Sequence, residues 1–66
     1  MEITTLKKVK MGEFFKRLRK GSPSAKVYVK DYYEPSEHKY WVYDYFDVNS
    51  GFFLKGSTEV TTDFEF

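Results

Sequence analysis

The chain has 66 residues, including seven Phe, six Tyr and one Trp, with no Cys and a formal net charge of +1. This length predicts one domain over residues 1–66 with a small core, and the lack of Cys excludes disulfides and thiolate zinc sites. No apolar run is long enough to span a membrane, and MEITTLKKVK lacks the apolar core of a signal peptide, so we expect a cytoplasmic location.

Residues 13–21, EFFKRLRKG, fit either a short helix or a first strand. For the helix, Glu13 lies early, basic residues lie late, and Gly21 provides a stop before Ser22-Pro23. Gly12 would interrupt any longer helix. We favour the strand, because the rest of the chain has β patterns and a closed barrel leaves fewer exposed edges.

The centre of the chain predicts a hairpin, with strands KVYVKDYYE and KYWVYDYFD joined by Pro35-Ser36-Glu37-His38. A four-residue loop sets the opposite charges of Glu34 and Lys39 face to face. On the same face this register pairs Tyr32 with Trp41, Lys30 with Tyr43 and Tyr28 with Tyr45. On the other face it pairs Tyr33 with Tyr40, Asp31 with Val42, Val29 with Asp44 and Val27 with Phe46.

The two faces of this hairpin differ in chemistry. The hydrocarbon side chains Val27, Val29, Val42 and Phe46 share one face, which we expect to be core. The other face carries rings with polar groups, which tolerate partial exposure. Asp31 and Asp44 fall on the core face, where an unpaired carboxylate is costly, so we predict a bulge near residues 43–45 that turns Asp44 outward.

The last third predicts a turn at Asn49-Ser50-Gly51, a short strand GFFLKG over 51–56, and a terminal strand EVTTDFEF over 59–66. In the terminal strand, Phe64 and Phe66 alternate with acidic residues, as expected for one buried and one solvated face. The predicted fold is mainly β: a small antiparallel sheet or partly open barrel of about five strands, SH3-like or OB-like, with a short N-terminal helix as the alternative at residues 13–20. The predicted buried residues are Phe15, Val27, Val29, Val42, Phe52, Val60 and Phe64.

The motifs MGEFF, VYVKDYY and KYWVYDYFDVNSGFFLKG occur in this order before the alternating strand. In this the chain resembles short uncharacterised β-rich proteins of phages and mobile elements of gut Bacteroides-type bacteria. It departs from their usual pattern at Asp31, where they more often have Gly, and at Gly51. The resemblance implies a β-rich single domain and transfers no site residues.

Catalysis has little support in the sequence. His38 is the only histidine and lies in a predicted turn with no obvious nucleophile, which favours a solvated loop residue over a general base. Asp31 and Asp44 fit either a carboxylate pair of the glycosidase or metal-binding kind or two structural aspartates, and we favour the second because so short a chain rarely holds a large cleft. The calcium-loop start at Asp47 has Phe52 where glycine is required. We therefore expect no enzyme activity, cofactor or metal.

The aromatic face of the hairpin is the predicted binding site, formed by Tyr28, Lys30, Tyr32, Trp41 and Tyr43. Tyr and Trp are common anchors of protein interfaces, and rings beside a cation also hold single-stranded nucleic acid. The same rings fit a purely structural role, as cross-strand pairs or under the N-terminal segment. We place a protein partner first, including self-association as a homodimer, and single-stranded nucleic acid second.

Charge is divided unevenly along the chain. Residues 1–30 carry nine Lys or Arg and two Glu, whereas residues 31–66 carry two Lys and eight Asp or Glu. This pattern fits charges that interleave across strands, and it also fits a bipolar surface whose basic patch would attract phosphates. The residues of the predicted patch are Lys7, Lys8, Lys10, Lys16, Arg17, Arg19 and Lys20.

Overall fold

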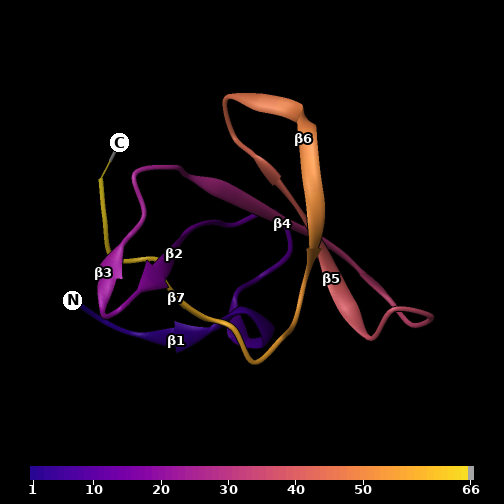
Figure 1. Ribbon diagram of the computed structural model, residues 1–66, viewed down its shortest axis with the longest axis horizontal. Helices are drawn as coiled ribbons and strands as arrows, with labels where there is room; N and C mark the ends of the chain where they lie inside the picture. Colours follow the sequence, from indigo (N-terminus) through magenta and orange to yellow (C-terminus); the bar gives the residue numbers. More distant parts are fainter. Residues whose placement is uncertain (66) are drawn as a thin grey trace.

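A computed structural model describes residues 1–65 and confirms a mainly β fold (Figure 1). Its strands are β1 (Thr4–Thr5), β2 (Phe14–Arg19), β3 (Ser22–Pro23), β4 (Tyr28–Glu34), β5 (Lys39–Asp44), β6 (Asp47–Leu54) and β7 (Glu59–Thr61). The only helix in this part of the chain is one 3-10 turn, η1 (Leu6–Lys8). The strand predicted around residues 13–20 is therefore confirmed, and the helical alternative for that segment is wrong.

All strand pairs are antiparallel, and the sheet order is β1-β7-β2-β4-β5-β6 with β3 paired to β2. The sheet is open: β1 and β6 are the end strands of this order and do not pair with each other within the described residues. Strand β2 connects its two parts: Phe14 and Phe15 pair with β4, and Lys16 and Arg17 pair with β7. In Figure 1, β4, β5 and β6 accordingly form a twisted unit on the right, and β1, β2, β3 and β7 lie on the left.

The β4–β5 hairpin begins as predicted and then changes register. Glu34 pairs with Lys39 and Tyr33 with Tyr40, but Lys30 pairs with Val42 instead of Tyr43. The register shift lies between Lys30 and Tyr33, so β4 contains one extra residue there. The bulge predicted near residues 43–45 of this hairpin is wrong in position; the irregularity at Tyr43 and Asp44 belongs to the β5–β6 pairing.

This bulge reverses the two faces over the first half of β4. Side chains alternate with a period of two, so a shift of one residue moves each side chain before the bulge to the opposite side of the sheet. Lys30 thereby shares a face with Val42, and Val29 pairs with Tyr43 on the other face. Asp31 falls within the bulge and is only half-buried, so the bulge relieves the conflict at Asp31 and leaves Asp44 buried.

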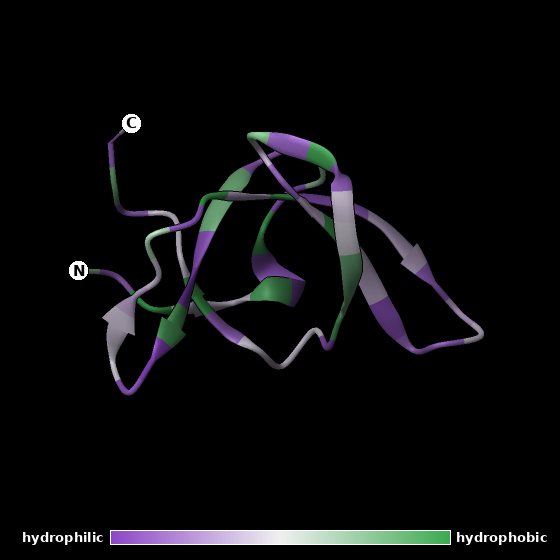
Figure 2. Cartoon of the chain, turned by 45° about the horizontal axis from the view of Figure 1, so that its top comes forward, coloured by the Kyte–Doolittle hydropathy of each residue, from purple (hydrophilic) through white to green (hydrophobic). Residues whose placement is uncertain are grey.

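The core lies on the Val42 side of the sheet and is formed by Leu6, Val9, Phe15, Val42, Leu54 and Val60. Tyr28, Tyr40 and Phe52 pack against it. The η1 turn contributes Leu6, and Figure 2 shows this turn within the curve of the strands. The sequence predicted no helix or strand before residue 13, and yet this N-terminal segment completes the core.

The predicted burial of Phe15, Val27, Val29, Val42 and Val60 is confirmed. Val29 is buried on the side away from the core cluster, because the bulge moves it there, and Val27 is also outside the core cluster. Phe52 and Phe64 are half-buried.

Three local predictions are corrected. Phe46, expected in the core, is 76% exposed, because the turn between β5 and β6 lies at Tyr45 and Phe46. The turn predicted at residues 49–51 is instead part of β6. The terminal strand is shorter than predicted, since β7 ends at Thr61, and Phe66 lies outside the described residues.

The two phenylalanines Phe15 and Phe64 provide a test of where the core lies. Phe15→Ala should destabilise the chain by about 3–5 kcal/mol, because the ring is fully buried among core side chains. Phe64→Ala should cost clearly less, because Phe64 lies beyond the last strand and stays half-buried. Urea unfolding of both variants measures the difference; an equal or larger loss for Phe64→Ala would show that the terminal segment belongs to the core.

Candidate functional site

Lys30 was predicted to lie on the outer aromatic face, and this prediction is wrong. Its side chain is buried, with a relative exposure of 6%. The Nζ group donates hydrogen bonds to the carbonyl oxygens of Lys7, at 3.3 Å, and Val9, and it lies 4.1 Å from the centre of the Tyr40 ring. Lys30 thus connects η1 to the sheet and is not available to a partner on the outer face.

The backbone of Lys30 strengthens the same connection. Its N–H donates to the carbonyl of Glu13 at 3.2 Å, and its carbonyl accepts from the N–H of Gly12 at 2.7 Å. Gly12 has a φ of 86°, a left-handed conformation that glycine adopts without strain. Side chain and backbone together join residues 7–13 to β4.

Burial also changes the ionisation of Lys30. Removal from water lowers the pKa of this ammonium below its ordinary value, and the negative charge of Glu13 acts in the opposite direction. The two carbonyls and the Tyr40 ring provide the partners that a buried ammonium requires.

The outer face carries a cluster of three rings, one from each strand of the β4–β6 unit. Tyr32 stacks on Trp41, with ring centres 6.5 Å apart and an interplanar angle of 20°. Phe53 meets Trp41 edge to face at 5.0 Å and 71°. We call Tyr32, Trp41 and Phe53 the outer ring cluster. Tyr32 is 43% exposed, and the other two rings are half-buried.

A close approach to the backbone fixes the central ring of this cluster. The indole of Trp41 lies over Gly51 so closely that a Cβ on Gly51 would be 2.3 Å from Cζ2 of the indole. Real side chains do not approach so closely, so glycine at position 51 makes room for the ring. The indole therefore packs directly on the backbone of β6.

The structure divides the five predicted ring-face residues between two sides of the sheet. Tyr32, Trp41 and Tyr43 stay together on the outer side, with Tyr43 half-buried. Tyr28 lies on the core side between Phe15, at 5.8 Å, and Phe52, at 5.6 Å. Phe53 was not predicted to belong to this face. It could be recognised only through its pairing with Trp41, and that pairing requires knowledge of the β5–β6 register.

The predicted basic residues come from several parts of the chain. Lys7 and Lys8 belong to η1, whereas Lys16, Arg17 and Arg19 belong to β2. The first two of these β2 residues contact different rings: Lys16 Nζ lies 4.9 Å from the Phe64 ring, and the Arg17 guanidinium carbon lies 5.6 Å from the Phe52 ring. The remaining predicted members, Lys10 and Lys20, lie in exposed connections before and after β2.

The acidic and histidine candidates do not converge on one site. His38 is exposed in the β4–β5 turn with a φ of 55°. Asp44 pairs with Tyr28 across the sheet, and Asp31 lies in the bulge, so the two carboxylates are not cross-strand neighbours. Within residues 1–65, no group of three or more His, Asp or Glu side chains is placed to hold a metal ion.

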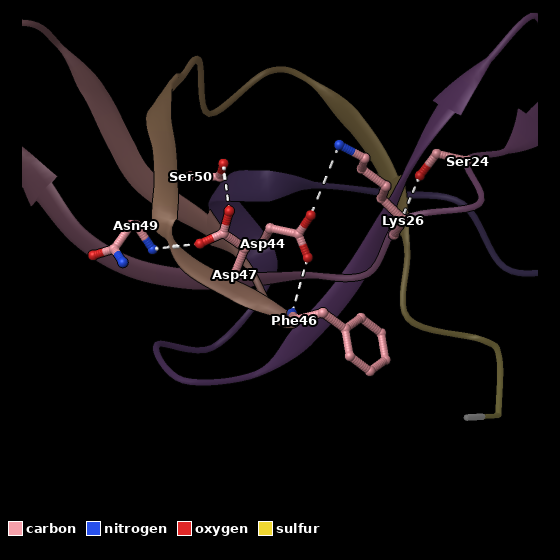
Figure 3. A network of polar contacts seen from close by, with 7 residues as sticks. All are labelled: Ser24, Lys26, Asp44, Phe46, Asp47, Asn49 and Ser50. Atoms are coloured by element: carbon pink, nitrogen blue, oxygen red, sulfur yellow. Dashed lines mark hydrogen bonds and ion pairs between the residues drawn. The ribbon is translucent and has the colours of Figure 1, made fainter.

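Asp44 has structural partners near the β5–β6 turn (Figure 3). One of its oxygens accepts a hydrogen bond from the N–H of Phe46 at 2.9 Å, and the other lies 3.8 Å from Nζ of Lys26. Asp47 accepts from the N–H of Asn49 at 3.2 Å and from Oγ of Ser50 at 3.1 Å. The contacts with Phe46 and Lys26 explain how the buried Asp44 is accommodated at this position.

Comparisons with known proteins give no assignment: no family model matches the chain, and no curated protein or solved structure matches it significantly. The resemblance to phage and mobile-element proteins, and the SH3-like or OB-like form, therefore stay predictions. Among the described helical residues, no segment has the length and apolar character needed to cross a membrane.

Gly51→Ala tests the packing of the Trp41 indole on the backbone of β6. The added methyl group should displace the indole and destabilise the chain by about 1–3 kcal/mol, as overpacking does. The intrinsic fluorescence of Trp41, the single tryptophan, should shift because its surroundings change. Gly21→Ala is not a matched control, because its φ of 80° adds strain; Asn49→Ala serves instead, because the Asn49 contact with Asp47 uses its backbone N–H. Unchanged fluorescence and stability in Gly51→Ala would contradict the close packing.

Lys30 predicts a specific pH dependence. Since burial lowers its pKa in the folded chain, the unfolded chain still holds the proton at pH values where the folded chain has released it. The free energy of unfolding therefore gains a contribution that grows as pH rises from the folded pKa toward the ordinary value of 10.5. Lys30→Met lacks this contribution, so the natural chain should gain stability relative to the variant over that window.

Urea unfolding at a series of alkaline pH values measures this difference. The exposed residue Lys55 supplies the control, because Lys55→Met makes the same substitution without removing a buried ammonium. A stability difference between the natural chain and Lys30→Met that stays constant up to pH 10.5 would be the contrary result.

Proposed function

We propose that this protein is a non-enzymatic binding module that associates with a second copy of itself through the outer ring cluster. The observation that carries the proposal is the arrangement of Tyr32, Trp41 and Phe53 on the side of the sheet away from the core, with Tyr32 43% exposed. Tyr and Trp are frequent anchors of protein interfaces, because each combines a large apolar ring with a polar group.

The rim of the outer ring cluster suits contact between identical surfaces. Alternation along the strands places Glu34, Lys39 and Lys55 on the same face, each two residues from a ring of the cluster. A two-fold interface sets each patch against its own copy, so a rim with both signs of charge can pair across the axis. Self-association would also add apolar burial that so short a chain lacks.

Strand β6 favours the same partner. It ends the sheet order, so its outer edge is unpaired within the described residues, and it carries Phe53. Val48, at the start of this strand, is 67% exposed. An open edge beside an aromatic cluster is a common place for a second chain to pair.

Binding of single-stranded nucleic acid by the same ring face was the second prediction, and it has less support. It required a cation among the rings, and Lys30 is instead buried on the opposite side. A cytoplasmic location stays a prediction from the sequence.

Self-association should appear as a concentration-dependent monomer–dimer equilibrium in sedimentation velocity and as a melting temperature that rises with protein concentration. Trp41→Ala should weaken the dimer by about 2 kcal/mol or more, as expected for an interface anchor, and more than charge changes at Glu34 or Lys39. Because Trp41 also packs on Gly51, the decisive variant is Tyr32→Ala, which removes a more exposed ring.

Tyr33→Ala is the matched control for Tyr32→Ala. The two tyrosines are adjacent and nearly equally exposed, at 43% and 44%, but Tyr33 pairs with Tyr40 on the opposite side of the sheet. Tyr32→Ala should weaken the dimer, and Tyr33→Ala should leave it intact. A clean monomer at high concentration, or equal effects of the two variants, would overturn the proposal.

A further inference from the structure

A basic groove lies away from the outer ring cluster, between β2, the start of β4 and the β3–β4 connection. It has a volume of about 360 Å³ and is lined by Arg17, Arg19, Ser24, Ala25, Lys26 and Tyr28. A second groove of about 240 Å³ continues it past Asp44, Ser50, Gly51 and Phe52 and shares Lys26 and Tyr28 with the first. We call the two together the basic trough.

Positive charge dominates the basic trough. Arg17, Arg19 and Lys26 line it, and Asp44 is the one carboxylate among its described lining residues. Asp44 lies 3.8 Å from Lys26, whose side chain is still 68% exposed, so this pair is solvated and weak. Within residues 1–65, neither arginine forms an ion pair with a carboxylate, and their charge is therefore uncompensated.

The walls of the trough hold its cations in place. The Arg17 guanidinium lies over the Phe52 ring, which limits where it can point. The N–H of Ser24 donates to the Arg17 carbonyl at 2.7 Å, and Ser24 Oγ donates to the Lys26 carbonyl at 2.9 Å. Figure 3 shows the Lys26 side chain extending from this connection toward Asp44 and the start of β6.

We propose that the basic trough binds the phosphate groups of a single-stranded oligonucleotide. Arginine binds phosphate through paired N–H donors, and two uncompensated arginines beside a lysine provide a sequence-independent site for a phosphate backbone. The two grooves share Lys26 and Tyr28, so together they provide a continuous surface along which a phosphate backbone can run. Tyr28 and Phe52 are largely occupied by neighbouring rings, so phosphates, and not stacked bases, supply the affinity.

This site is separate from the surface proposed for self-association. Phe52 and Phe53 are consecutive residues of β6, so they project to opposite sides of the sheet. Phe52 lines the trough, and Phe53 belongs to the outer ring cluster. A dimer formed through the cluster would leave the trough open, and either proposal can fail without the other.

Fluorescence anisotropy of a labelled, mixed-sequence single-stranded DNA at low salt tests the site. The natural chain should bind, with an affinity that falls steeply as salt is added. The double variant Arg19→Gln/Lys26→Gln should bind about 10-fold more weakly or worse, and the slope of log K against log salt should be smaller by about 1.4, at about 0.7 per lost phosphate contact. The single variant Arg19→Gln should reduce the slope by about half as much, at about 0.7. This variant keeps the Lys26–Asp44 pair.

The matched control is Lys8→Gln/Lys10→Gln, which removes the same charge from exposed positions outside the trough. This variant should retain most of the affinity, and Tyr32→Ala should bind DNA normally. No binding at low salt, or equal loss in the two double variants, would overturn the proposal. Equal binding of adenosine monophosphate would exclude a strand as the ligand, and equal competition by polyglutamate at matched charge would exclude phosphate recognition.

Discussion

The buried ammonium of Lys30 is the interaction on which the rest of the structure depends. A charge removed from water is costly unless it is paired, and here its partners are the carbonyls of Lys7 and Val9 and the ring of Tyr40. The carbonyls belong to η1 and its C-terminal end, where backbone acceptors lack partners within the helical turn. The contact therefore satisfies both groups, and it holds Leu6 and Val9 in the core.

The bulge in β4 makes this interaction possible. With unbroken pairing, Lys30 would share a face with Trp41 and project away from η1; the extra residue before Tyr33 turns it to the core side. The same shift sends Tyr28 inward and Val29 outward. One residue in one strand thus decides which rings complete the core and which remain on the outer face.

Local patterns predict much of this fold, and pairing between distant strands supplies the rest. The β character of residues 14–19, the turn after Glu34 and the burial of Val42 follow from periodicity and turn chemistry. The bulge could not be located, because the conflict of Asp31 and Asp44 with a buried face can be relieved on either strand, and the choice depends on η1. Phe53 was missed because its partner, Trp41, is identified only by the β5–β6 register, whose turn lies at Tyr45 and Phe46 although residues 49–51 have stronger turn chemistry.

The uneven charge of the sequence is also redistributed by the fold. Lys26 lies near Asp44, and the N-terminal amine lies 3.8 Å from Asp63, so basic and acidic halves of the chain meet at these points. Where they meet, the charges offset one another, as expected from interleaved strands. Arg17 and Arg19 follow Phe15 on one side of β2, and no described carboxylate pairs with them. The excess positive charge is thereby concentrated beside the half-buried rings of Tyr28 and Phe52, on the side of the sheet that self-association would leave open.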